Sequence, residues 1–205
     1  MARERQSGAR GNARVSARSM AGSVSTVSVV DYDPAWPRAF AALRARLSEA
    51  VGEVALAIEH VGSTAVPGLA AKPIIDITIV IASAEQMPLL ISRLGKLGYR
   101  HQGDLGIEGR EVFAAADGGV AHHLYACARG NLALENHIAV RDYLRGHPEA
   151  AAEYGTLKRR LAREHARDRT AYGAAKTDLI LEILRRAGFP HSKLAASERA
   201  NRRAV

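Results

Sequence analysis

The stretch HVGSTAVPGLAAKPIIDITIVIA, residues 60–82, decides the fold of this chain. It joins a turn of small residues, Gly62-Ser63-Thr64, to a nearly continuous apolar run over residues 73–82, which predicts a central strand buried on both faces. Within that run Asp76 lies between two isoleucines, where an ionised carboxylate is costly unless a cation or hydrogen-bond donors meet it. The turn offers backbone N–H groups and hydroxyls to an anion. An anion cradle followed by a strand carboxylate is the layout that a magnesium–nucleotide site requires.

Strand and helix patterns alternate on both sides of this stretch. The segment Asp117-Gly118-Gly119 separates two strand-like runs and is typical of a hairpin turn. Pro148 at a first-turn position and Asp168 as a helix cap predict helices in the last third of the chain. We therefore expect an α/β fold, a mixed β-sheet flanked by helices with a helical C-terminal third. Strands are expected at residues 25–32, 54–61, 73–82, 99–102, 111–116 and 120–128, and helices at about 37–51, 84–96, 132–146, 148–161 and 169–187.

The charge of the chain is concentrated at its two ends. The whole sequence of 205 residues carries a formal net charge of +8. Residues 1–26 hold five arginines against one glutamate, and residues 191–205 hold four basic side chains against one glutamate, so the body between them is nearly neutral. We therefore expect one domain over residues 27–190 between two disordered basic tails, and we do not expect a nucleic-acid groove or a nucleic-acid partner.

Other features of the composition limit where the protein acts. Cys127 is the only cysteine, which excludes an intrachain disulfide and a cysteine-based zinc cluster. No apolar run approaches the roughly 20 residues that span a bilayer. Residues 1–26 lack the apolar segment of a secretory signal. Their Arg- and Ser-rich composition fits either a transit peptide or an unstructured extension. A third alternative is that translation begins at Met20 and that the residues before it come from an upstream start codon. Cytoplasmic placement is the expectation.

The motif around the small-residue turn resembles the signature of the GrpB family. That family is similar in pattern to the nucleotidyltransferase superfamily of DNA polymerase beta type. The resemblance extends over approximately residues 27–189. It rests on His60–Gly68 and Lys72–Ile77, and further on His122-His123-Leu124, Arg141–Arg145, Tyr154, Lys158, Tyr172 and Lys176.

The resemblance implies a nucleotidyltransferase-like fold and a particular chemistry. A Gly-Ser element grips nucleotide phosphates, acidic residues on neighbouring strands hold Mg²⁺, and a hydroxyl or phosphate attacks the α-phosphorus with release of pyrophosphate. Asp76 and Thr78 take the metal-ligand positions, although Thr78 stands where the superfamily usually has a second acid. Tyr125 also departs from the pattern, because the family often has a histidine there.

The candidate catalytic residues are Asp76 and His123, and both have structural alternatives. Asp76 is either a ligand for a metal or substrate or the acceptor of a structural hydrogen bond. His123 is either a general base or metal ligand in place of an acid, or a hydrogen-bonded histidine of the sheet. His60, just before the turn, is interpreted as orienting that turn.

The candidate phosphate-binding residues come from three parts of the chain. The turn is either a phosphate cradle or a tight connection without a ligand. The side chains of Lys72 and Arg110 face either a phosphate or solvent. Two lysines of the helical tail are included because they match family positions, whereas a charge run on a helix is usually solvated. These candidates are Gly62, Ser63, Thr64, Lys72, Arg110, Lys158 and Lys176.

Two functions are consistent with these residues. One is a nucleotidyltransferase-like protein that binds a Mg–nucleoside triphosphate and transfers a nucleotidyl group to an unknown acceptor. The other is a non-catalytic nucleotide- or coenzyme-binding module. In both cases the expected partner is a nucleotide or phosphorylated small molecule, the expected cofactor is Mg²⁺, and the oligomeric state is left open.

Overall fold

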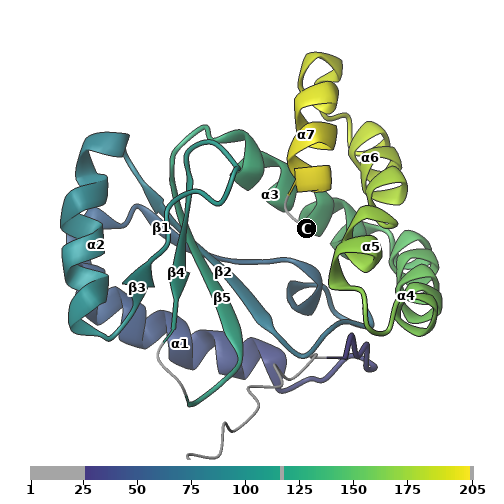
Figure 1. Cartoon of the computed structure of the whole chain (residues 1–205), viewed down its shortest axis with the longest axis horizontal. Helices are drawn as coiled ribbons and strands as arrows, with labels where there is room; N and C mark the ends of the chain where they lie inside the picture. Colours follow the sequence, from purple (N-terminus) through teal and green to yellow (C-terminus); the bar gives the residue numbers. More distant parts are fainter. Residues whose placement is uncertain (1–25, 116–117, 204–205) are drawn as a thin grey trace, which may run out of the picture.

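The computed structural model describes residues 26–115 and 118–203, and it has a five-stranded mixed sheet as its centre (Figure 1). The strand order is β1-β2-β5-β4-β3, in which β2 and β5 are parallel and the other neighbours are antiparallel. The mixed sheet confirms the expected fold class, and the antiparallel pairing of β4 with β5 confirms the hairpin. The strands are β1 Ala57–Val61, β2 Ile75–Ile81, β3 Arg100–His101, β4 Arg110–Ala114 and β5 His122–Ala128.

Seven helices flank this sheet within the described part of the chain, and three short 3₁₀ turns lie in the connections between the first elements. The predicted end of the first helix is confirmed, because Gly52 follows it with a positive φ of 52°. The predicted C-terminal helix divides in two at Ala175 and Lys176. The helices are α1 Trp36–Val51, α2 Met87–Lys96, α3 Leu132–Gly146, α4 Pro148–Glu164, α5 Arg169–Ala174, α6 Thr177–Arg186 and α7 His191–Arg203, and the 3₁₀ turns are η1 Gly52–Val54, η2 Ser63–Ala65 and η3 Ala84–Gln86.

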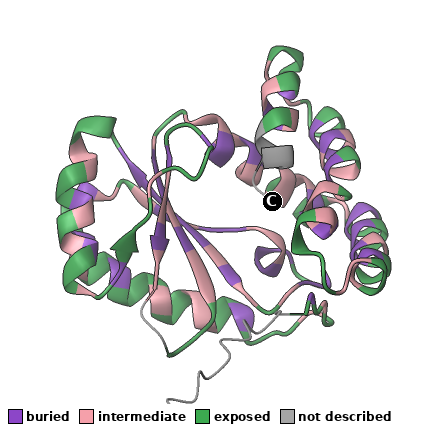
Figure 2. Ribbon diagram, in the orientation of Figure 1, coloured by how far each residue is buried: buried purple, intermediate pink, exposed green. Residues whose placement is uncertain are grey.

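Two apolar clusters hold the fold together on opposite sides of the sheet region. The larger joins α1 and α2 to the strands and includes Leu47, Ile77 and Leu90. The other joins α3, α4 and α6 to the segment after the small-residue turn, through residues such as Leu69 and Ile183. Figure 1 shows α1 and α2 on one side of the strands and α3 to α7 on the other. Buried residues run along the strands in Figure 2, as the apolar sequence of β2 predicts.

The first predicted strand is wrong. In the described part of residues 25–32, only Val30 pairs as an isolated bridge, with Ala71. The β-branched pattern indicates an extended backbone, but an extended segment becomes a strand only where a neighbour supplies a ladder of hydrogen bonds.

The prediction of a disordered tail over residues 191–205 is also wrong for the described part. Residues His191–Arg203 form α7, and its Leu194 is buried against Leu181 and Leu184 of α6. Composition alone does not reveal the apolar surface that a short helix finds on its neighbour. The predicted tail over residues 1–26, with the Met20 alternative, lies outside the described residues apart from Thr26.

No helix in the described ranges is long and apolar enough to span a bilayer.

Candidate functional site

The small-residue turn lies directly against the carboxylate of Asp76. Gly62 has a φ of 71°, and a Cβ atom at this position would come within 2.3 Å of Asp76 Oδ2. Only glycine therefore combines this backbone conformation with so close an approach. The turn and the strand carboxylate open onto one shared space.

Hydrogen bonds of Thr64, one buried and one part-buried, fix the turn. Thr64 Oγ1 donates to the carbonyl oxygen of Ile74 at 3.3 Å and lies 3.0 Å from His60 Nε2. Because the single hydroxyl proton of Thr64 is used, His60 Nε2 is the donor in the second bond. His60 stacks on Phe40 with ring centroids 4.5 Å apart, and burial lowers its pKa to about 4. These contacts give His60 the orienting role expected of it, and they occupy the Thr64 hydroxyl.

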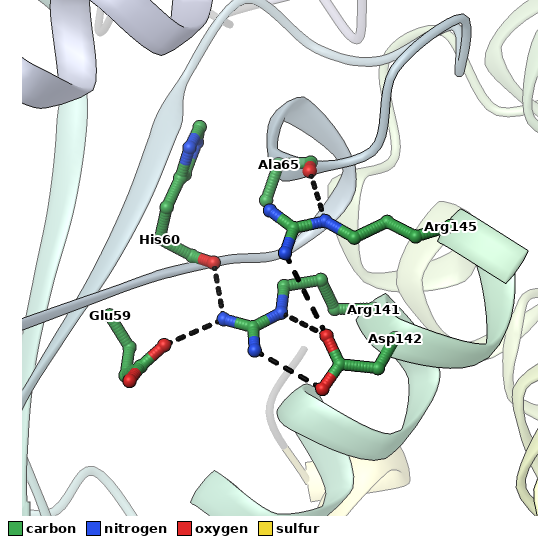
Figure 3. Close-up of polar contacts among 6 residues, drawn as sticks. All are labelled: Glu59, His60, Ala65, Arg141, Asp142 and Arg145. Atoms are coloured by element: carbon green, nitrogen blue, oxygen red, sulfur yellow. Dashed lines mark hydrogen bonds and ion pairs between the residues drawn. The ribbon is translucent and has the colours of Figure 1, made fainter.

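Two arginines of helix α3 hold the same turn and the strand before it (Figure 3). Arg141 donates to Glu59 Oε2 at 2.7 Å and to the carbonyl oxygen of His60 at 3.0 Å. Arg145 Nε donates to the carbonyl oxygen of Ala65 at 2.9 Å. Arg141 and Arg145 belong to the family resemblance but not to the predicted site. They position the turn.

Asp76 and His123 form a hydrogen-bonded pair across the two parallel strands. They are register partners in β2 and β5, and Nδ1 of His123 lies 2.8 Å from Oδ1 of Asp76. On the other side of the ring, Nε2 lies 3.4 Å from Nη2 of Arg169. A carboxylate only accepts and a guanidinium only donates, so both neighbours favour the imidazole with its proton on Nδ1 and a lone pair on Nε2.

A cavity of about 350 Å³ lies between this pair, the turn and the helical C-terminal third. The structure brings nearly all the predicted site residues into its lining: Gly62, Ser63, Thr64, Lys72, Asp76, Arg110, His123, Lys158 and Lys176. Thr78 is the exception. It is 2% exposed, lies outside the lining, and its Oγ1 has no hydrogen-bond partner among the described residues.

Lysines of the cavity lie on the faces of two buried tyrosines. Lys158 Nζ is 4.5 Å from the ring centroid of Tyr154, and Lys176 Nζ is 4.6 Å from that of Tyr172. Lys72 Nζ is 5.7 Å from the Tyr172 ring. These two rings therefore carry cations on their faces.

The local environment disfavours the charged form of all three lysines. Burial, with Lys176 and Arg159 nearby, holds the pKa of Lys158 well below its usual range. Burial and the neighbouring Lys72 lower the pKa of Lys176 to about 8. Burial and Arg169 lower that of Lys72. An anion in the cavity would relieve this penalty.

Arg110 of strand β4 brings a further cation to the cavity. Its guanidinium lies 4.7 Å from the ring centroid of Tyr125, and its Nε has no hydrogen-bond partner among the described residues. Burial lowers the pKa of Arg110, and burial, followed by the charge of Asp76, raises that of Tyr125 to about 12.

Sequence reasoning missed two side chains that line the cavity as functional candidates. Arg169 is only one charge in a basic run of the sequence, yet it contacts His123. His137 of α3 has no distinguishing sequence signal, although it lies beside Tyr125 with ring centroids 6.4 Å apart, and burial lowers its pKa. Only the packing of the helices against β5 places these residues at the site.

The donor set does not fit the two-metal site that the resemblance implies. Asp76 is the only carboxylate among the described residues that line the cavity, and Thr78 lies outside it. No group of three His, Cys, Asp or Glu side chains that could hold a metal occurs in the described ranges. Mg²⁺ prefers oxygen ligands and uses one or two carboxylates together with substrate phosphates. Asp76 alone offers one such ligand.

Comparisons with known proteins agree with the sequence motif. The UPF0157 protein YqkA of Bacillus subtilis (strain 168) is 37% identical over 154 residues, which make up 75% of this chain and 45% of YqkA. A dephospho-CoA kinase of Mycolicibacterium paratuberculosis is 31% identical over 186 positions, covering 78% of this chain and 46% of the kinase. The chain thus spans less than half the length of these two relatives.

A solved structure and a family model extend this similarity to most of the chain. The crystal structure of conserved protein GrpB from Enterococcus faecalis superposes with a TM-score of 0.71 and 35% identity, covering 78% of this chain and 96% of that one. The family model described as GrpB protein matches residues 26–186. Because that match covers well over half of its residues, the chain belongs to the GrpB protein family.

Proposed function

We propose that the cavity binds the triphosphate of a nucleotide and that the protein transfers the nucleotidyl group to an acceptor. The observation that carries this proposal is the convergence of cationic side chains on one cavity whose only described carboxylate, Asp76, is bound to His123. Cations that lie buried together without anionic partners are costly, and a polyanionic ligand supplies those partners. Arg141 also lines the cavity but is already paired with Glu59. The other cations are Lys72, Arg110, Lys158, Arg169 and Lys176.

His123 is the proposed general base. Asp76 accepts a hydrogen bond from Nδ1 and orients the ring. The Nε2 lone pair faces Arg169 Nη2 at 3.4 Å, and it becomes the base when the acceptor hydroxyl takes the place of the guanidinium. Nε2 of His123 takes the proton of the acceptor hydroxyl while the hydroxyl oxygen forms a bond to the α-phosphorus of the nucleotide. The bond from that phosphorus to the bridging oxygen of the leaving pyrophosphate breaks, and the surrounding lysines stabilise the charge that develops there.

The substitution His123→Asn tests the catalytic part of this proposal. Asparagine can still donate to Asp76 but cannot act as a base, so pyrophosphate release should fall by about 10²–10⁴-fold while nucleotide binding persists. The matched control is His122→Asn. His122 lies on the same strand, but it binds Tyr99 and the carbonyl oxygen of Val120 and does not line the cavity. Release that survives His123→Asn contradicts the proposed base, and the lack of binding to any nucleoside triphosphate contradicts the site.

A second candidate function is a nucleotide- or coenzyme-binding module without transfer chemistry. The position of Thr78 outside the cavity favours it, because the second acid of the superfamily has no substitute there. A relative with the name dephospho-CoA kinase makes coenzyme A precursors suitable probes beside nucleotides. Thermal stabilisation by such a ligand, with no pyrophosphate released from any nucleoside triphosphate, is the result that this candidate predicts.

A further inference from the structure

The charges that line the cavity do not balance. Apart from Arg141, which is paired with Glu59 and Asp142, five cationic side chains face a single carboxylate, and that carboxylate is already hydrogen-bonded to His123. An uncomplexed triphosphate carries about four negative charges at neutral pH, since the terminal phosphate has a second pKa of about 6. A bound Mg²⁺ cancels two of these charges. The free anion therefore matches the lining better than its magnesium complex does.

We infer that the cavity binds the polyphosphate as the free anion and that lysine and arginine side chains take the neutralising role of Mg²⁺. This inference rests on the proposed function and specifies the form of its ligand. It also departs from the expectation of Mg²⁺ that the family resemblance raised.

The positions of the lysines support this assignment. Lys158 is 2% exposed, and its Nζ has no hydrogen-bond partner among the described residues. Lys72 and Lys176 share the ring of Tyr172, at 5.7 and 4.6 Å from its centroid. A tyrosine face offsets only part of the cost of burying an ammonium group. Two ammonium groups at one ring repel each other, so this arrangement is satisfied by an anion between them.

The surroundings of Asp76 also disfavour a divalent cation, because they offer few ligands and are rich in positive charge. Oδ1 of Asp76 accepts from His123, and Oδ2 lies against Gly62. The position two residues further along the strand is Thr78, which has no charge and lies outside the cavity. A cation seated at Asp76 would gain one carboxylate and meet the repulsion of the nearby lysines and arginines.

Isothermal titration of the full chain separates the two forms of the ligand. The probes are inorganic tripolyphosphate and ATP, each titrated once in EDTA and once with saturating Mg²⁺. We expect binding in EDTA that is about tenfold tighter than with Mg²⁺, because the complex has lost two of the charges that the lining meets. Binding that requires Mg²⁺ overturns this inference and leaves the proposed site intact. Binding in neither condition overturns both.

The variant Asp76→Asn gives an independent readout, because asparagine keeps the shape of the side chain. Loss of the one repelling carboxylate should tighten binding of the free anion by about threefold. A magnesium bridge predicts the opposite, a loss of affinity in Mg²⁺ that EDTA does not reproduce. Asp33→Asn is the matched control, since Asp33 caps the turn before α1 and does not line the cavity. Thermal unfolding of both variants confirms that they fold.

Discussion

Gly62 is the residue on which the geometry of the cavity depends most directly. Its missing side chain leaves room for the carboxylate of Asp76, which a Cβ atom would approach to 2.3 Å. The same carboxylate aligns His123. A single methyl group at residue 62 would therefore displace both the turn and the hydrogen-bonded pair of Asp76 and His123.

The substitution Gly62→Ala should weaken triphosphate binding and abolish pyrophosphate release. It introduces two penalties, a strained positive φ worth about 1–2 kcal/mol and the clash with Asp76. Gly68→Ala is the matched control for the strain of the positive φ alone, because Gly68 has a φ of 76° and a Cβ atom there would meet nothing within 4 Å. Unfolding in urea and titration with tripolyphosphate compare the two. Equal loss of affinity in both variants would contradict the importance of the Gly62–Asp76 contact.

Lys176 provides a pH-dependent test of the same cavity. Its pKa is about 8 in the folded protein against 10.5 ordinarily, so the unfolded chain binds more protons between these values. The penalty for burying this ammonium group is full below pH 8 and is relieved as the pH rises toward 10.5. Without ligand, Lys176→Met should therefore be more stable than the parent at pH 7, and this advantage should disappear by about pH 10.5. Urea unfolding from pH 7 to 10.5 measures the difference, with the exposed Lys96→Met as control. A pH-independent difference would contradict the role of the charge.

The sequence allowed part of this site to be predicted, and the reason is proximity along the chain. Gly62 and Asp76 lie on one strand–turn–strand unit, so their types and spacing already indicate an anion site. Thr78 shows the limit of that reasoning. Alternation places it on the same strand face as Asp76, but it lies two residues further into the sheet, between its register partners Glu59 and Tyr125, and is buried outside the cavity lining. Arg169 depends on helix packing that no local pattern specifies.

At the scale of elements, strands and helices with strong local signals were predicted and those that depend on a partner were not. Helix α3 begins and ends at the expected residues, with Asn131 as its cap. The segment at 25–32 has strand-like residues without a neighbouring strand to pair with along its length. Helix α7 has few apolar residues, and its partner surface on α6 exists only in the folded protein.

The packing of α7 leads to a stability prediction. Leu194 is 7% exposed and contacts the apolar cluster that includes Leu181 and Leu184. Leu194→Ala should lower the free energy of unfolding by about 2 kcal/mol, the lower part of the range for buried leucine. The control is Leu56→Ala, because Leu56 is 44% exposed and its truncation should change stability by less than about 0.5 kcal/mol. If Leu194→Ala has no effect in urea unfolding, α7 does not pack against α6, and the prediction of a disordered C-terminal tail is correct.

At the scale of the whole molecule, the cavity lies between two separately packed cores. One contains the sheet with α1 and α2, and the other contains α3, α4 and α6. The carboxylate of the cavity comes from the sheet side, whereas Lys158, Arg169 and Lys176 come from the helical side. Without a bound anion, the like charges of the helical side repel each other. Local unfolding of the helical side should therefore cost less free energy than local unfolding of the sheet side.

A bound polyphosphate should therefore protect the helical side selectively. In the proposed site it would link Lys158 and Lys176 to the turn at Gly62, and a ligand at about 100 times its dissociation constant would add roughly 2.7 kcal/mol to the stability of the folded state. Amide hydrogen exchange with and without tripolyphosphate measures where that stabilisation is felt. We expect slower exchange mainly in α4, α5 and α6, and little change in α2, which belongs to the other core. In Lys158→Met the protection of α4 should be lost although the ligand-free fold remains. Equal protection of α2 and α4 would instead indicate one cooperative unit, in which the charges of the cavity do not control local opening.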